Sequence, residues 1–172
     1  MIRLISLAAI TAISLGQVAA VQAMDLTAAV GRTGESTNTY RLGAQFDFGT
    51  SWFQSSVGRL TGYWDAGYTY WEGDKASTNH SISLTPVFVY EFAGDSVKPY
   101  LELGIGVAAF ENTQIEDKDL GSSFQFEDRF GAGLRFAGGH EVGLRAIHYS
   151  NAGIKNPNDG IESYAVHYRM AF

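Results

Sequence analysis

The chain has 172 residues, with 18 acidic and 12 basic side chains, a formal net charge of −6 and no cysteine. The lack of cysteine excludes disulfide bonds, thiolate metal sites and cysteine nucleophiles, and the acidic balance argues against a nucleic-acid partner. Glycine is frequent (20 residues), proline is rare (3 residues) and 13% of the residues are aromatic. Together with short segments of alternating polarity, this composition is typical of an all-β protein.

The N-terminal stretch carries the features of an export signal. Arg3 supplies a positive charge, residues 4–15 are apolar, and Val21-Gln22-Ala23 is a small-x-small cleavage site. The apolar part is too short to cross a bilayer as a helix. We therefore expect residues 1–23 to be a signal peptide and residues 24–172, or 172 − 23 = 149 residues, to form a single domain.

Eight segments of the remaining chain alternate apolar and polar residues, which is the pattern of β-strands. In the fifth segment, for example, Leu101, Leu103 and Ile105 alternate with Glu102 and Gly104. In chain order, we expect strands at residues 25–32, 39–48, 59–71, 81–92, 99–110, 122–136, 140–150 and 161–172.

The polar faces of these segments carry charges of both signs, whereas the opposite faces are almost wholly apolar and aromatic. A membrane barrel has this arrangement, with apolar side chains outside and charged side chains inside. Closure of the barrel also gives every backbone polar group a hydrogen-bond partner, which a lipid environment requires. The charged residues expected to face the lumen are Arg41, Asp47, Asp65, Glu102, Glu127, Arg129, Arg135, Glu141, Arg145 and Arg169.

The last segment supports this interpretation. Its residues Tyr164, Val166, Tyr168, Met170 and Phe172 form an apolar stripe that ends in a terminal aromatic, which resembles the C-terminal signature of bacterial outer-membrane barrels. Eight strands enclose a lumen just wide enough for side chains to fill, and paired charges inside it argue against a channel. The sequence therefore predicts an eight-stranded antiparallel transmembrane β-barrel of the outer membrane, with a lumen filled by side chains.

Loop lengths predict the orientation of the barrel. Short turns are expected at residues 93–96 and 137–139, and outer-membrane barrels keep short turns in the periplasm and longer loops outside. The pattern leaves residues 51–58 unassigned. The longer loops are expected at residues 34–38, 73–79, 111–121 and 151–160. We therefore expect the strand ends beside the last of these loops to lie in the outer leaflet.

Polar residues interrupt the apolar stripe at that end. His148 and Ser150 share the outward parity of Leu144 and Ala146 in one strand, and Glu162 has outward parity at the start of the next. Ionisable groups that face hydrocarbon are costly and favour a functional interpretation. A serine nucleophile needs a base within reach, and the base needs a third group to orient it, so these residues are candidates for nucleophilic catalysis.

Some alternatives remain open at this stage. Asp128 also interrupts an outward stripe and would lie opposite position 148 if the hairpin is centred on Gly138, so parity does not choose between Asp128 and Glu162 as the acid. His148 and Ser150 would also be tolerated as plain polar residues of the headgroup zone. Charges at Arg32, Lys118 and Lys155 fit solvated loop positions better than contacts with lipid phosphates, and the remaining histidines, His80, His140 and His167, fit structural positions.

Two segments carry a resemblance to a known family, namely His148-Tyr149-Ser150-Asn151-Ala152-Gly153 and Pro157-Asn158-Asp159-Gly160-Ile161-Glu162. In these segments the sequence closely resembles the lipid A 3-O-deacylases (the PagL type) of Gram-negative outer membranes. The likeness extends to residues 60–65 and 124–128. The resemblance implies an enzyme that hydrolyses the ester-linked acyl chain at position 3 of lipid A, with no metal and no cofactor. It implies Ser150 as nucleophile, His148 as base and Glu162 as orienting acid.

The same resemblance implies further residues and partners. Asn151, Gly153 and Asn158 match the loop around the site and, with Asp128, are candidates for contacts with the substrate or the oxyanion. The expected partners are lipid A or lipopolysaccharide of the outer leaflet and the membrane itself, and a homodimer is left open. The alternative functions are a lipid A acyltransferase and a non-enzymatic barrel for adhesion or membrane integrity.

Overall fold

The computed structural model describes residues 24–171, so the expected signal peptide and the terminal Phe172 lie outside the described residues. Its strands are β1 (Met24–Thr33), β2 (Asn38–Asp47), β3 (Gly58–Trp71), β4 (Asn79–Phe92), β5 (Val97–Phe110), β6 (Gln114–Ile115), β7 (Lys118–Asp119), β8 (Phe124–Phe136), β9 (Glu141–Ser150) and β10 (Ile161–Met170). No helix in this part of the chain is long and apolar enough to cross a membrane.

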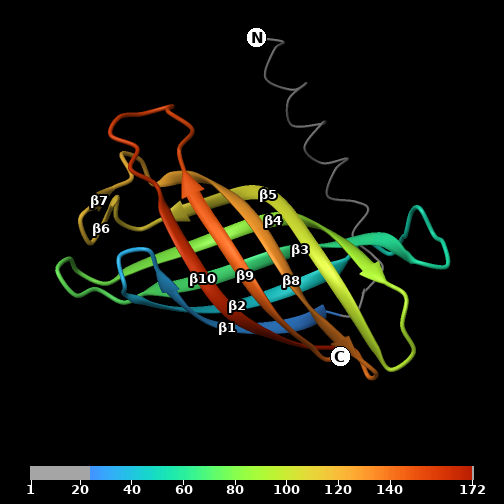
Figure 1. The fold of residues 1–172 in the computed structure, drawn as a ribbon. Coiled ribbons are helices and arrows are strands. Elements are labelled where there is room, and N and C mark those ends of the chain that lie inside the picture. The colour runs from blue at the N-terminus through green and yellow to red at the C-terminus, as the bar shows by residue number, and fades with distance from the viewer. Residues whose placement is uncertain (1–23, 172) are drawn as a thin grey trace, which may run out of the picture.

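The long strands form one closed antiparallel barrel, in the order β1-β10-β9-β8-β5-β4-β3-β2 (Figure 1). Each of these strands pairs with its neighbour in sequence, apart from the short pair β6 and β7, and β1 pairs with β10 to close the wall. Closure leaves the long strands without a free edge. The predicted fold is confirmed, and each of the expected segments is a strand of the wall.

The lumen is filled by paired charges. Arg129 lies 3.1 Å from Asp65 and 2.7 Å from Glu127, and Arg145 lies 2.6 Å from Glu102, all of them buried. Buried charges are tolerated when each is paired and hydrogen-bonded, so these contacts make the polar interior possible. One charge expected to face the lumen lies at the rim of the barrel and is not buried. Asp47 ends β2 and is exposed, and its carboxylate accepts a hydrogen bond of 2.7 Å from the Gly49 N–H.

The connections differ between the two ends of the barrel. One end carries the expected longer loops, including the loop of residues 151–160 between β9 and β10 (upper left in Figure 1). The opposite end carries the two short turns but also residues 48–57, which protrude as a longer hairpin. Phe48 and Trp52 of this hairpin fold back onto the wall and pack against Phe88, with ring centroids 5.7 and 6.5 Å apart. Aromatic packing therefore holds the stretch that the pattern leaves unassigned.

The small sheet of β6 and β7 lies within the loop between β5 and β8, beside the loop of residues 151–160 (Figure 1). The Asp119 N–H donates to an Asp159 carboxylate oxygen at 2.8 Å, and the Asp159 N–H donates to the Asp119 carbonyl at 3.2 Å. Glu116 links the same small sheet to the loop after β3. Burial acts to raise the pKa of Glu116, but the N–H groups of Asp74 and Lys75, at 2.7 and 2.8 Å, hold it below its ordinary value. The loops at this end thus brace one another.

Candidate active site

His148 and Glu162 meet on the outside of the wall because β9 and β10 are paired in the register that sets them opposite each other. His148 Nδ1 lies 2.9 Å from Glu162 Oε1, and the two side chains are 41% and 42% exposed. A neutral imidazole that donates its Nδ1–H to the carboxylate keeps a free lone pair on Nε2. This geometry suits a histidine that accepts a proton from a nucleophile.

Ser150 follows two residues later on the same face of β9 and is half-buried. Its cross-strand neighbour on β8 is Phe126. Within residues 24–171, the Ser150 hydroxyl makes no hydrogen bond. The structure therefore places Ser150 beside His148 without joining them, and such contacts are often loose in enzymes without bound substrate.

Asp128 lies on the other side of His148. It is the cross-strand neighbour of His148 on β8, as the hairpin centred on Gly138 predicts. Asp128 is exposed, and its carboxylate makes no hydrogen bond or ion pair with any described residue. The hydrogen bond of His148 goes to Glu162 instead. This hydrogen bond therefore distinguishes Glu162 from Asp128 as the partner of His148, which strand parity alone does not.

Asn151 holds the loop that follows Ser150. Its side chain is fully buried, and its Nδ2 donates to the Leu120 and Lys155 carbonyls, both at 2.8 Å. The Asn158 Oδ1 accepts a hydrogen bond of 2.9 Å from the Asn151 backbone N–H. Because both N–H groups of the Asn151 amide are occupied, this side chain serves the loop and has no donor left for an oxyanion.

The backbone turns sharply directly after Asn151. Ala152 and Gly153 have φ values of 53° and 78°, in the left-handed region. A Cβ placed on Gly153 would meet nothing within 4 Å, so the space beside it is open. Successive N–H groups in such turns form concave sites for anions.

Gly160 is a residue of the site that sequence reasoning missed. It has a φ of 67°, and a Cβ there would lie 2.9 Å from His148 Cε1 and 3.5 Å from Nε2. Only glycine leaves the imidazole its present place, since real Cβ atoms do not approach so closely. A glycine at the end of a loop is an ordinary turn signal, so the sequence alone does not distinguish this role.

An apolar groove runs along the wall beside these residues. Its volume is about 490 Å³, and its lining includes Leu103, Ile105, Phe130, Asp128, His148 and Glu162. A second groove of about 600 Å³ shares Phe130, Ala146 and Tyr164 with the first and reaches β1 at Val30 and Arg32. The small Ala146 side chain lies where the two grooves meet. Grooves of this size and polarity accept apolar ligands.

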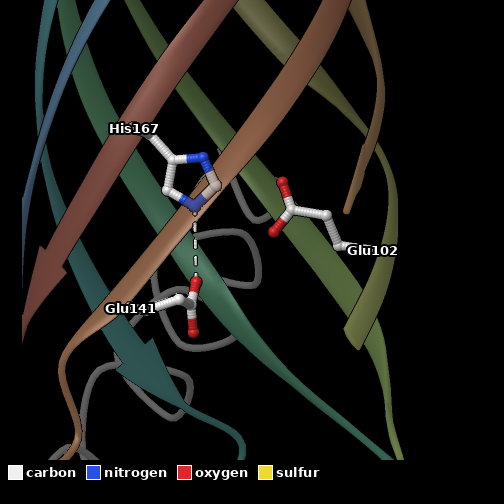
Figure 2. Close-up of side chains that lie close together, drawn as sticks. All are labelled: Glu102, Glu141 and His167. Atoms are coloured by element: carbon white, nitrogen blue, oxygen red, sulfur yellow. Dashed lines mark hydrogen bonds and ion pairs between the residues drawn. The ribbon is translucent and has the colours of Figure 1, made fainter. Parts of the chain in front are cut away.

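A different titratable cluster lies inside the barrel, where Glu102, Glu141 and His167 approach one another (Figure 2). Their ligand atoms all lie within 4.8 Å, an arrangement that sequence spacing does not show. Both carboxylates are already paired with guanidinium groups, since Arg145 Nε lies 2.6 Å from Glu102 and Arg135 lies 2.9 Å from Glu141. The cluster therefore belongs to the charge network of the lumen, and His167, for which the sequence favours a structural position, is buried there.

A closed barrel with an apolar outer wall and a histidine–carboxylate pair open to that wall defines a class of protein, the membrane-embedded β-barrel enzyme. Comparisons with known proteins identify the family within this class. Residues 38–171 match the family model described as lipid A 3-O-deacylase (PagL). The chain belongs to this family and is an outer-membrane enzyme that hydrolyses esters.

Individual relatives cover nearly the whole chain. The lipid A deacylase PagL of Pseudomonas aeruginosa is 63% identical over 169 residues, which cover 98% of each chain. The lipid A deacylase PagL of Bordetella bronchiseptica is 38% identical over 138 residues, or 77% of this chain and 76% of the relative. A crystal structure of the outer membrane enzyme PagL superimposes with a TM-score of 0.83 at 65% identity, covering 86% of this chain and 99% of the other.

Proposed function

We propose that the chain hydrolyses the ester-linked 3-O acyl chain of lipid A, with Ser150 as nucleophile, His148 as general base and Glu162 as orienting acid. Family membership supports lipid A deacylation. The observation that carries the residue assignment is the 2.9 Å contact between His148 Nδ1 and Glu162 Oε1. Ser150 lies two residues from His148 on the same face, which supports its hydroxyl as the group that uses the free Nε2.

In the proposed reaction, the Ser150 hydroxyl attacks the ester carbonyl while His148 Nε2 takes its proton. The tetrahedral intermediate collapses when the imidazolium gives this proton to the departing sugar 3-hydroxyl, which leaves the acyl chain on Ser150. Water, activated by His148 in the same way, then releases the fatty acid. Glu162 fixes the tautomer of the imidazole through Nδ1 and stabilises the imidazolium.

The setting favours this chemistry. His148 and Glu162 open onto the apolar outer wall, beside the groove of about 490 Å³. We infer that this wall faces lipid and that the site lies at its outer-leaflet end, so the acyl chain of the substrate lies in the groove while the sugar stays at the headgroup level. A site that excludes water strengthens the interactions that stabilise developing charge.

The oxyanion requires N–H donors that are free. Asn151 does not qualify, because its amide is occupied by the Leu120 and Lys155 carbonyls. We propose the backbone N–H groups of Ala152 and Gly153 and the Asn158 side-chain amide as donors. The left-handed turn directly after Asn151 supports this choice.

Mass spectrometry of lipid A from cells that produce the wild-type chain or Ser150→Ala tests the proposal. The wild type should remove one acyl chain, Ser150→Ala should remove none, and Ser77→Ala, in an exposed loop, should behave like the wild type. Lipid A that gains an acyl chain would support the acyltransferase alternative. Unchanged lipid A in cells with the folded wild type would support the non-enzymatic barrel.

Export and assembly remain predictions of the sequence. We propose cleavage after Ala23, with residues 24–172 forming the single barrel domain, and the N-terminal residue of the purified protein tests this. Self-association is tested by the mass of the purified protein in detergent, corrected for bound detergent.

A further inference from the structure

Formal charge is nearly absent from the outer wall. At the outward positions of the long strands that the structure describes, the only formally charged residues are Arg32, Asp128 and Glu162. Asp128 and Glu162 are the cross-strand neighbours of His148 on its two sides. The proposed function uses Glu162 as the orienting acid, and Asp128 borders the same imidazole. The proposed function gives no role to Arg32.

Arg32 lies close to the active site. It sits on β1 opposite Tyr164 of β10, and Tyr164 is two residues from Glu162 on the same face. Two strand spacings of about 4.8 Å each separate β1 from β9. Arg32 also lines the groove of about 600 Å³, which shares Phe130, Ala146 and Tyr164 with the groove beside His148. A molecule that occupies both grooves therefore reaches both Arg32 and His148.

Arg32 differs from the other arginines in the described residues, because each of those forms an ion pair with a carboxylate. Arg32 is exposed, and its Nε donates to the Ser36 carbonyl at 3.0 Å. Its two terminal NH₂ groups make no hydrogen bond or ion pair with any residue of 24–171. These NH₂ groups are free hydrogen-bond donors that carry a positive charge, on a residue that lines an apolar groove.

An unpaired cation beside hydrocarbon is costly, and an anionic ligand would offset that cost. A guanidinium binds phosphate through two parallel charge-assisted hydrogen bonds. Lipid A is an acylated glucosamine disaccharide that carries phosphate groups a few bonds from its acyl esters. Its phosphates therefore have the charge and geometry that the free end of Arg32 can bind.

We propose that Arg32 binds a phosphate group of lipid A and thereby fixes the position of the sugar whose ester lies at Ser150. The inference rests on the proposed function and adds the residue that recognises the headgroup. Three lysines are the rival cations near this end of the barrel, and Lys75 is already paired with Asp117. Lys118 is 3.4 Å from Glu35 and so already paired, whereas Lys155 is exposed in the loop of residues 151–160. Arg32 is favoured over Lys155 because it lies on the wall itself and lines the groove.

Steady-state kinetics of the purified full chain test this with lipid A that carries its phosphates and with lipid A from which they have been removed. On phosphorylated lipid A, Arg32→Gln should lower kcat/KM roughly ten- to a hundredfold, mainly through KM, because a charge-assisted hydrogen bond is lost. On dephosphorylated lipid A, wild type and Arg32→Gln should be equal. Arg32→Lys should keep part of the preference for phosphorylated over dephosphorylated lipid A, since it retains the positive charge but loses the bidentate geometry.

Lys155→Gln is the matched control, because it removes the same charge from the exposed loop of residues 151–160. It should leave the ratio of rates on the two substrates as in the wild type. Equal losses of Arg32→Gln on both substrates would overturn the proposal and leave Arg32 a structural role in bonding Ser36. A phosphate-dependent loss in Lys155→Gln alone would assign recognition to the loop instead.

A binding measurement tests the phosphate site independently of the proposed catalytic function. In a Ser150→Ala background, the chain should bind vesicles with phosphorylated lipid A more tightly than vesicles with dephosphorylated lipid A, and Arg32→Gln should abolish that difference. This measurement requires no turnover. If wild type deacylates neither substrate but the difference in binding persists, the proposed function fails and the phosphate site stands.

Discussion

The strands β9 and β10 carry two histidine–glutamate pairs, one on each face of the same sheet. On the outer face, His148 of β9 meets Glu162 of β10 at 2.9 Å, and on the inner face His167 of β10 meets Glu141 of β9 at 3.4 Å. The inner pair is sealed, with side chains 0% and 1% exposed, and Nε2 of His167 also lies 3.0 Å from the Tyr100 hydroxyl. The outer pair is half-exposed and keeps Nε2 free.

The comparison teaches that a histidine–carboxylate pair does not by itself make a general base. Access of substrate and a nitrogen without another partner decide the role, and only the outer pair has both. The inner imidazole faces Glu141, as Figure 2 shows, and also contacts the Tyr100 hydroxyl inside the filled lumen, where it contributes to the packing of the barrel. The same substitution should therefore lower activity when made in the outer pair and lower stability when made in the inner pair.

The largest effect is expected from replacing the two histidines by asparagine. His148→Asn should lower deacylation by roughly 10³- to 10⁶-fold, the range seen when a member of a catalytic triad is lost, while the barrel folds normally. His167→Asn should keep near wild-type activity per folded molecule but unfold more easily. Rates on lipid A vesicles, normalised to the folded fraction seen by electrophoresis without heating, check this. Full activity in His148→Asn would remove the assignment of the base.

The next effect separates the two acids beside His148. Glu162→Gln should lower kcat roughly 10⁴-fold, as loss of the orienting acid does in other triads, because the amide no longer favours the required tautomer. Asp128→Asn should lower it no more than about tenfold, since its carboxylate makes no contact with the imidazole. Steady-state kinetics of the two variants side by side provide the measurement. A reversed order would make Asp128 the orienting acid.

The inner pair is probed through stability. Glu141→Gln should lower the free energy of unfolding by about 3 kcal/mol, because Arg135 and Arg169 each lose one carboxylate partner and keep only Glu91 and Asp25. Glu35→Gln breaks the partly exposed pair with Lys118 at the barrel surface and should cost no more than about 1 kcal/mol. Urea unfolding in lipid vesicles gives both values. A Glu141→Gln barrel as stable as the wild type would contradict the structural role given to the inner pair.

The smallest effect concerns the glycine against the outer imidazole. Gly160→Ala should lower kcat roughly 10²-fold with little change in KM, because its Cβ would displace His148 from Glu162. Gly138→Ala is the matched control. Its φ of 86° imposes similar backbone strain at the opposite end of the barrel, with its nearest neighbour at 3.7 Å.

A spectroscopic signature distinguishes positioning from general damage to the fold. The downfield proton resonance of the His148–Glu162 hydrogen bond should be lost in Gly160→Ala and kept in Gly138→Ala. If both alanine variants lose activity alike while the resonance persists, Gly160 has no special relation to His148.

Alternation predicts the barrel well because a strand repeats every two residues and every long strand here is part of one wall. The rule does not predict burial at a strand end, where Asp47 has the inward parity of its partner Tyr63 but is exposed. It also gives no account of residues 48–57 or of β6 and β7, because their conformations depend on packing against distant segments. Local patterns do not encode such contacts.

The features of the site also fall into those that strand alternation predicts and those that depend on contacts between distant segments. Parity places His148, Ser150 and Glu162 on one face, since each lies on a regular strand. Which carboxylate reaches the imidazole depends on side-chain direction, and the roles of Gly160 and of the grooves depend on how a loop and neighbouring strands close around it. The occupied amide of Asn151 likewise becomes visible only when the Leu120 carbonyl is brought beside it.

A site that opens sideways from a closed wall also determines how concentration acts on the enzyme. Its proposed substrate arrives by lateral diffusion in the plane of the bilayer, so the relevant quantity is the number of lipid A molecules per unit of membrane area. Adding more vesicles of the same composition would leave turnover per enzyme unchanged once every enzyme is embedded. Diluting lipid A with an inert lipid within each vesicle would slow it.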